Sequence, residues 1–271
     1  MRTACATSSR QRGFTLLEVA LVVLVMGILL TTLMTMRNQG ASRSTASEAA
    51  FMDAAVSGLF QYAKRNNRLP CPDLNGDGLE DAVGGICPNG THSGGIPYLT
   101  LELPLSSPVG TGLDRQFVYG VFRGDGDVAK DLTRSAERSV PPHVAPHLSF
   151  ESPDDFKHAL INALNATSNI VSDSNLYVTG NDAGAGVADC ASKKVTNVAF
   201  VVVSAGASNA DQQGTDFDGP NLPGVGWSES TKWESVKANT CFAGPGKPIT
   251  ARYDDQVRAV SFTELMGFFA Q

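Results

Sequence analysis

Residues 14–36 read FTLLEVALVVLVMGILLTTLMTM, and this stretch sets the organisation of the whole chain. Seventeen of its 23 residues are apolar, and no charged residue interrupts it after Glu18. At about 1.5 Å of rise per residue, such a helix would measure roughly 34 Å, enough to cross the ~30 Å hydrocarbon core of a bilayer. Residues 1–13 contain Arg2, Arg10 and Arg12 but no acid, so the positive-inside rule places residue 1 in the cytoplasm. The stretch predicts a membrane-spanning helix with the rest of the chain exported.

Two other targeting signals fit this N-terminus less well. A secretory signal peptide has an apolar region of about 7–15 residues followed by a small-residue cleavage site. This stretch is longer and continues into Thr35-Met36-Arg37. A lipoprotein signal at Cys5 would need an apolar segment before that cysteine, and none is present. The residues therefore favour a membrane helix.

Glu18 is the one acidic residue inside the apolar stretch. A carboxylate at that depth costs a few kcal/mol in a bilayer unless it is paired or protonated. The side chain either reaches back to the membrane surface or meets a cation at the same depth.

The segment Arg12-Gly13-Phe14-Thr15-Leu16-Leu17-Glu18, followed by the apolar helix, resembles the processing and assembly segment of type IV pilins and pseudopilins. The resemblance implies that a prepilin peptidase cleaves between Gly13 and Phe14 and that Phe14 is then N-methylated. It also implies that Glu18 pairs with the new α-amino group of Phe14 on a neighbouring subunit during assembly. Two buried opposite charges are tolerable when they meet in this way.

Membership of this group implies a structural subunit of a pilus or of a type II secretion pseudopilus. The expected partners are the prepilin peptidase, other pilin or pseudopilin subunits and an inner-membrane assembly platform. The chain is expected to cross the inner membrane once, with a periplasmic C-terminal domain, before it enters the filament. A minor subunit is favoured over a major one, because the exported part is large for a filament repeat and residues near Thr35 lack the helix-kinking proline of many major pilins.

The helical pattern continues beyond the apolar stretch. Phe51, Ala55, Leu59 and Tyr62 follow one another at i, i+4, i+8 and i+11, so they share one face of a helix. Pro70 disfavours helix at the residue before it. We therefore expect one long helix from about residue 14 to 66, membrane-embedded first and amphipathic afterwards.

The rest of the chain predicts an α+β domain in which an antiparallel sheet covers the apolar face of this helix. Residues 70–115 are rich in Gly and Pro and are expected to form long irregular loops. The expected segments are a leader at 1–13, the membrane helix at 14–36, its amphipathic continuation at 37–68 and a periplasmic domain at 69–271. Strands are expected at 116–122, 176–179, 195–204 and 256–262, a helix at 154–166, and a packed or helical tail at 265–269.

Five cysteines are present, and removal of the leader would remove Cys5. The remaining four would lie in an oxidising compartment, where disulfides form. Four cysteines allow three pairings. Closure of two local loops favours Cys71–Cys87 and Cys190–Cys241. Zinc binding is the competing interpretation, but the chain has no Cys-x-x-Cys pair and its histidines are scattered.

Asp73-x-Asn75-x-Asp77-Gly78 has the spacing of the start of a calcium loop, with oxygen side chains at alternate positions and a glycine for the turn. The twelfth position is a glycine rather than an acid, so Glu80 and Asp81 are the candidates to complete the site. The same residue types also form polar turns. Calcium is therefore a candidate ligand here, and no other cofactor is expected.

A second and looser group of acids consists of Asp211, Asp216, Asp218, Asp254 and Asp255. The resemblance implies that calcium near the closing strand is worth considering for this group, because some pseudopilins use calcium there.

Composition and motifs narrow the remaining function classes. The net charge of −6 is the opposite of what a nucleic-acid binder shows. No serine-hydrolase elbow, phosphate loop or dinucleotide fingerprint occurs, so no enzymatic activity is expected. Two alternatives stay open: a filament-tip adhesin or ligand-binding module that uses the loops at 70–115 and 205–250, and, more remotely, a membrane-tethered periplasmic enzyme.

Overall fold

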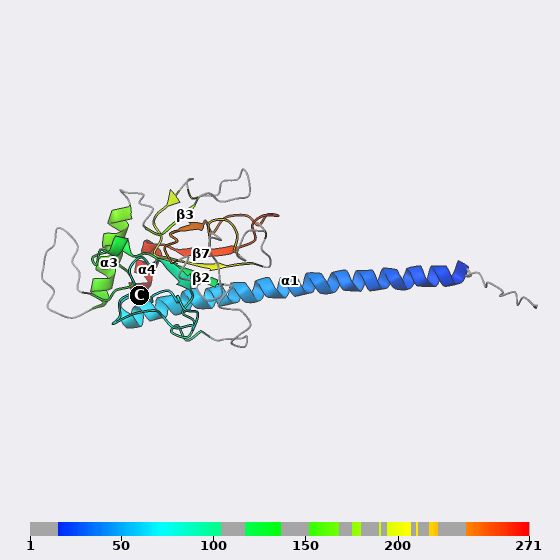
Figure 1. The fold of residues 1–271 in the computed structure, drawn as a ribbon, viewed down its shortest axis with the longest axis horizontal. Helices are drawn as coiled ribbons and strands as arrows, with labels where there is room; N and C mark the ends of the chain where they lie inside the picture. Colours follow the sequence, from blue (N-terminus) through cyan, green and yellow to red (C-terminus); the bar gives the residue numbers. More distant parts are fainter. Residues whose placement is uncertain are drawn as a thin grey trace, which may run out of the picture. The chain divides into compact units, whose positions relative to one another are not determined.

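The computed structural model describes residues 16–103, 117–136, 152–167, 175–179, 190, 194–206, 210, 217–221 and 237–270. The chain divides into two compact units, Met1–Ser44 and Thr45–Gln271, and all of the described strands belong to the second unit (Figure 1).

Helix α1 spans Leu16–Asn66, which agrees with the single long helix predicted for residues 14 to 66. The next residue, Asn67, terminates the helix: it has a φ of 53° and donates its backbone N–H to the carbonyl of Ala63 at 2.9 Å. Asparagine tolerates this left-handed conformation better than most residues, and a left-handed residue after the last turn is a common helix end.

No helix within the described residues is both long enough and apolar enough to span a membrane.

The end of α1 that belongs to the second unit supplies one wall of the hydrophobic core. Its inward face consists of buried side chains, namely Met52, Ala55, Leu59, Tyr62 and Ala63. Phe51 is partly buried and packs on Phe117, with ring centroids 4.3 Å apart. The predicted apolar face of this half of the helix is therefore confirmed.

The main sheet contains four antiparallel strands in the order β1-β2-β5-β7. The strands are β1 (Ser93–Gly95), β2 (Phe117–Val121), β5 (Phe200–Ser204) and β7 (Gln256–Val260). Every residue of the central strands β2 and β5 is buried. Such continuous burial explains the unbroken apolar sequence of residues 198–203.

A smaller sheet contains β4 (Lys194–Val195), β3 (Tyr177–Thr179) and β6 (Cys241–Ala243), in that order. The purely antiparallel expectation is wrong for this sheet, because β3 runs parallel to β6. The single strand expected at 195–204 is also wrong. The chain turns between β4 and β5, where the N–H of Val198 donates to the carbonyl of Thr196, and the two halves enter different sheets.

The described part of the second unit contains two further α-helices. Helix α3 (Pro153–Thr167) and helix α4 (Phe262–Phe269) pack together (Figure 1), with the rings of Phe156 and Phe269 5.2 Å apart. Ser261 caps α4 by accepting a hydrogen bond from the N–H of Glu264 at 3.1 Å. The predicted helix at 154–166 and the predicted helical tail are therefore confirmed.

The Gly- and Pro-rich region after α1 is more ordered than predicted. Besides the edge strand β1, it contains an antiparallel bridge between Asp73 and Gly95. Gly94 makes this close approach possible, because a Cβ there would lie 2.7 Å from the carbonyl oxygen of Asp73. The loop is thus held against the edge of the main sheet. Shortly after β2, a 3-10 turn at Gly124–Gly126 (η1) is the only other helical element that the described residues contain.

Candidate functional site

The N-terminal site residues are described only in part. Gly13 and Phe14 lie outside the described residues, and Glu18 lies in the first turn of α1. Beyond it, large apolar side chains of this helix are 45–66% exposed, namely Leu21, Val23, Leu24, Val25 and Met26. Burying one such side chain completely is worth roughly 1.5–3 kcal/mol. This part of the helix therefore presents a surface that gains free energy when lipid or another helix covers it.

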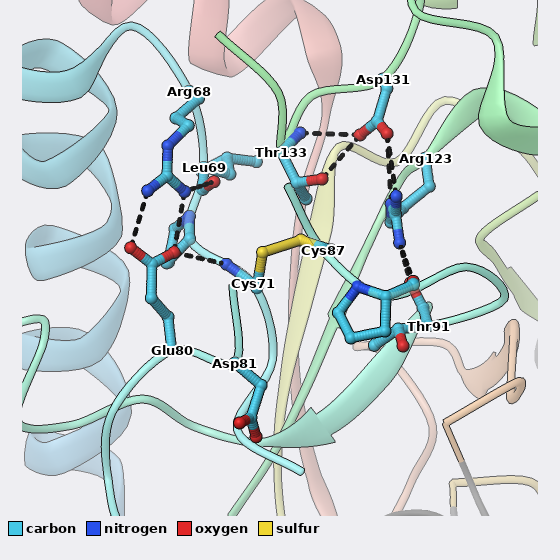
Figure 2. Close-up of a disulfide and its surroundings, with 12 residues drawn as sticks. Arg68, Leu69, Cys71, Glu80, Asp81, Cys87, Thr91, Arg123, Asp131 and Thr133 are labelled. Atoms are coloured by element: carbon cyan, nitrogen blue, oxygen red, sulfur yellow. Dashed lines mark hydrogen bonds and ion pairs between the residues drawn. A yellow bond between two sulfur atoms is a disulfide. The ribbon is translucent and has the colours of Figure 1, made fainter. Parts of the chain in front are cut away.

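A disulfide between Cys71 and Cys87 closes the loop that follows α1, with Cα atoms 5.4 Å apart (Figure 2). The bond spans 16 positions in the sequence. Both cysteines are buried, so the bridge lies within the domain rather than on its surface.

On one side of this disulfide, Arg68 and Glu80 join the end of α1 to the loop (Figure 2). The Arg68 guanidinium donates to both oxygens of Glu80, at 2.7 and 2.6 Å. The same carboxylate accepts the Tyr62 hydroxyl at 2.7 Å and the backbone N–H of Cys71 at 3.0 Å. Burial alone would raise the pKa of Glu80, but these donors outweigh it and hold the pKa below its usual value.

Glu80 is thus engaged by other groups in this structure, and its role as a candidate calcium ligand stays a prediction. Its two oxygens are held by the guanidinium of Arg68, the hydroxyl of Tyr62 and an amide. The spacing of acids in the sequence gave no sign of this, because Tyr62 lies on α1 and Arg68 lies just after the helix.

The other predicted calcium ligands lie in successive tight turns. Asp73 is buried and accepts backbone N–H groups of Gly76 at 2.6 Å and Gly78 at 2.7 Å. Asn75 and Asp77 are exposed, and each accepts the N–H of the residue two positions later at 2.8 Å. Asp81 folds back to bind the N–H of Asn75 at 3.2 Å. Calcium binding by Asp73, Asn75 and Asp77 stays a prediction.

On the other side of the disulfide, a buried ion pair joins Arg123 and Asp131 at 3.0 Å (Figure 2). Arg123 also donates to the carbonyls of Pro88 at 2.7 Å and Thr91 at 3.1 Å, which fixes the chain just after Cys87. Asp131 accepts the hydroxyl of Thr133 at 2.7 Å. Each partner of this ion pair is therefore hydrogen-bonded beyond the pair itself, which buried charges require.

The second disulfide joins Cys190 and Cys241, the first residue of β6, with Cα atoms 6.0 Å apart. The two disulfides are the pairings that local loop closure favours. Zinc binding by these four cysteines is excluded, because each sulfur is bonded to another sulfur.

Three members of the looser acid group come together beside β6. One carboxylate oxygen from each of Asp218, Asp254 and Asp255 lies within 4.8 Å of the others. No other such group of acidic, histidine or cysteine ligands occurs among the described residues. Asp211 and Asp216 lie outside the described residues. We call Asp218, Asp254 and Asp255 the aspartate cluster.

Asn221 organises the aspartate cluster, and no sequence motif indicated it. Its side-chain amide donates to Asp255 at 2.6 Å and to the hydroxyl of Tyr253 at 3.2 Å. Its side-chain oxygen accepts the N–H of Ala243 in β6 at 2.8 Å. Burial, followed by the neighbouring aspartates Asp218 and Asp254, raises the pKa of Asp255 to about 8. The environment of the cluster therefore disfavours the ionised form of Asp255.

Comparison with known proteins identifies the N-terminal segment. Residues 8–34 match a protein-family model described as the prokaryotic N-terminal methylation motif. This motif is the prepilin-type cleavage and methylation signal of type IV pilins and pseudopilins, so the resemblance of residues 12–18 to that segment is confirmed. No curated protein and no solved structure matches the chain. The motif supports a type IV pilin-like or pseudopilin subunit.

Proposed function

We propose that this chain is a minor subunit of a type IV pilus or of a type II secretion pseudopilus. A prepilin peptidase cleaves it between Gly13 and Phe14, Phe14 is N-methylated, and the mature subunit joins a filament. The observation that carries the proposal is the methylation motif at residues 8–34, with Glu18 inside an otherwise apolar stretch.

The exposed apolar side chains of α1 support this assembly mechanism. Before assembly, the lipid of the inner membrane covers residues 14–36. In the filament, the corresponding helices of neighbouring subunits replace the lipid. The helix exchanges one apolar environment for another, so extraction from the membrane carries little hydrophobic cost.

Glu18 sets the register between neighbouring helices, which apolar contacts alone would not define. Cleavage creates an α-amino group at Phe14, and that cation pairs with Glu18 of a neighbouring subunit. Because an unpaired charge is costly in an apolar environment, only the register in which the two charges meet is favoured.

The size of the second unit favours a minor subunit. In its described residues, the unit Thr45–Gln271 contains two sheets, the end of α1, the helices α3 and α4, the turn η1 and two disulfides. A filament built from many copies is easier to pack from small repeats, whereas a subunit used a few times tolerates a large domain.

Processing is tested by the intact mass of the protein expressed in a host with a prepilin peptidase. The expected mass is that of a chain beginning with N-methylated Phe14 and containing two disulfides. A chain that still begins at Met1 in that host would contradict the proposal.

Assembly is tested with Glu18→Ala in the same host. Cleavage should remain normal, while recovery of the subunit in sheared or cross-linked filaments should fall at least tenfold. Asp53→Ala is the matched control, because Asp53 is an exposed acid on the same helix that pairs with Arg258 at the surface. Normal incorporation of Glu18→Ala would refute the pairing role.

A further inference from the structure

The two edges of the main sheet differ in the residues that the structure describes. Beyond β1, backbone hydrogen bonds of 3.0 and 2.7 Å between Asp73 and Gly95 cover the edge. At the opposite edge, β7 pairs with β5, and no other described strand pairs with it. The open edge of a strand presents backbone N–H and C=O groups to which another extended chain can hydrogen-bond. Strand β7 is therefore the edge at which the sheet can be extended.

The pairing of β5 with its two neighbours shows which groups of β7 face outward. In antiparallel sheets, the residues of a strand bond alternately to the neighbour on one side and to the neighbour on the other. The N–H of Phe122 donates to the carbonyl of Ala199 at 3.0 Å, and the register of β2 and β5 continues from this pair. Odd-numbered residues of β5 therefore bond to β2, and its even-numbered residues bond to β7. The β7 residues opposite those even-numbered positions are Gln256, Arg258 and Val260.

Val257 and Ala259 consequently direct their backbone N–H and C=O groups away from β5. Within the described part of the chain, no backbone group of another segment bonds to either of them. Residues two apart in a strand lie roughly 6.8 Å from each other along it, which is also the repeat of an extended peptide. The two residues thus present a pair of donors and a pair of acceptors that match an added strand.

Two hollows lie along this edge. The smaller, of about 360 Å³, is bounded by Ala259 and Val260, and the larger, of about 560 Å³, by Val257 and its neighbours. Both are also bounded by Gly244 and Pro245, which directly follow β6. The hollows are therefore neighbouring parts of one groove, which we call the edge groove. Its near wall is β7, and its far wall is the chain at Gly244 and Pro245.

The smaller hollow contains a second unsatisfied group. Thr179 of β3 lines this hollow and is 1% exposed, and its buried Oγ1 has no hydrogen-bond partner among the described residues. Buried polar groups in native proteins are nearly always satisfied. The apolar side chains around the same hollow are those of Val178, Val195, Val198, Ala259 and Val260. The hollow therefore suits an aliphatic side chain whose own backbone or hydroxyl reaches Thr179.

We propose that the edge groove binds an extended segment of a partner protein, which adds a strand to the main sheet beside β7. In this mode of recognition, backbone hydrogen bonds provide affinity, and pockets for alternate side chains provide specificity. Val257 and Ala259 supply the backbone groups, and the smaller hollow takes an aliphatic side chain of the segment. The groove lies in the second unit, so this binding depends neither on cleavage after Gly13 nor on Glu18.

A second copy of this chain fits the edge groove poorly. An added strand has β7 on one side and the wall at Gly244 and Pro245 on the other. The strand must therefore be unpaired on its far side. The edge strand β7 of a second copy is already paired with its own β5, and that sheet would collide with the wall. A single extended segment meets no such obstacle.

The test uses the full chain in detergent and a fluorescein-labelled peptide of about six residues that alternates threonine and valine. Fluorescence anisotropy should show saturable binding. Two further peptides carry N-methyl groups on alternate amides, in one phase or in the other. An added strand hydrogen-bonds to β7 through every second residue only, so one methylated peptide should bind roughly tenfold more weakly or worse and the other should bind like the parent. Equal binding by the two methylated peptides, or no binding by the parent, would overturn the proposal.

Variants of the chain test the groove itself. Ala259→Pro removes an outward N–H but no bond to β5, a position where an edge strand tolerates proline, and it should weaken binding roughly tenfold. Val195 is 49% exposed, so Val195→Arg should fold even if Ala259→Pro does not, and its long side chain should block the smaller hollow. Gln61→Ala, on the exposed face of α1, is the control and should bind like the wild type.

Two results with these variants would contradict the proposal. The first is unchanged peptide binding by both Ala259→Pro and Val195→Arg. The second is a wild-type dimer in sedimentation that Ala259→Pro dissociates, because that result would assign the edge of β7 to a second copy.

Discussion

Arg68 and Glu80 form a two-pronged ion pair, with hydrogen bonds of 2.7 and 2.6 Å, just after helix α1 ends. The pair joins the helix to the disulfide loop, and both side chains are largely buried. A hydrogen bond to a charged group contributes about 1.5–3 kcal/mol. This interaction thus stabilises the transition from helix to loop, and removal of the Glu80 carboxylate would break it.

Replacement of Glu80 by Gln should lower the free energy of unfolding by about 1–3 kcal/mol at pH 7. The change keeps the size of the side chain but leaves the Arg68 charge without its partner. Urea unfolding of the full chain in detergent measures the difference. Asp53→Asn, which breaks an exposed pair with Arg258, should change the free energy much less.

The contribution of Glu80 should also depend on pH. Its pKa is lowered in the folded protein, so its stabilising effect is complete above the unfolded pKa of about 4.3 and is lost as the pH falls through the folded pKa. The difference in unfolding free energy between the wild type and Glu80→Gln should therefore shrink below pH 4. A difference that grows with acidity would contradict this assignment.

The two disulfides should contribute unequally to the free energy of unfolding. They span 16 and 51 positions, and the loop-closure model gives about 3 kcal/mol for the first and about 4 kcal/mol for the second. Urea unfolding of Cys71→Ser/Cys87→Ser and of Cys190→Ser/Cys241→Ser checks these values. An unchanged unfolding midpoint in either double variant would show that its bridge does not stabilise the domain.

Leu59 should be a key contact between α1 and the core. It is 0% exposed on the inward face of the helix, so Leu59→Ala should cost about 2–5 kcal/mol. Gln61→Ala, on the exposed face two residues later, should change stability little. Equal effects of the two substitutions in thermal unfolding would mean that this part of the helix does not pack as described.

Replacement of Gly120 and of Gly267 by alanine should have opposite effects on stability. A Cβ at Gly120 in β2 would lie 2.8 Å from the ring of Phe242 and 2.9 Å from Val201, so Gly120→Ala should cost about 1–3 kcal/mol. At Gly267, inside α4, no atom lies within 4 Å of the added Cβ. Gly267→Ala should stabilise the protein by about 0.5–1 kcal/mol through helix propensity. Thermal unfolding of the two variants distinguishes overpacking from a general effect of the methyl group.

Local patterns predicted the elements whose signals are contained within a few residues. The periodic apolar face from Phe51 to Tyr62 predicted the second half of α1, and the apolar run before Ser204 predicted a buried strand. At its N-terminal end the same prediction was wrong, because residues 194–195 form a separate strand in the smaller sheet. A strand pattern does not show which sheet each half joins, because that depends on partners far away in the chain.

The candidate sites also differ in whether their residues are neighbours in the sequence. The methylation motif is a contiguous sequence signal, so residues 12–18 were sufficient to indicate it. Glu80 looked like a calcium ligand because only its spacing from Asp73 was visible. Its hydrogen-bond partners in the structure are Tyr62 of α1 and Arg68, which lies just after the helix.

By itself, the sequence determined the N-terminal processing signal, the long helix and the supply of four cysteines beyond residue 13. These features follow from the order and periodicity of neighbouring residues. The tertiary structure alone decided that Asp218 meets Asp254 and Asp255, that Asn221 holds them in place, and that β3 pairs in parallel with β6. Residues so far apart in the chain come together only when burial of the apolar core fixes the paths of the segments between them.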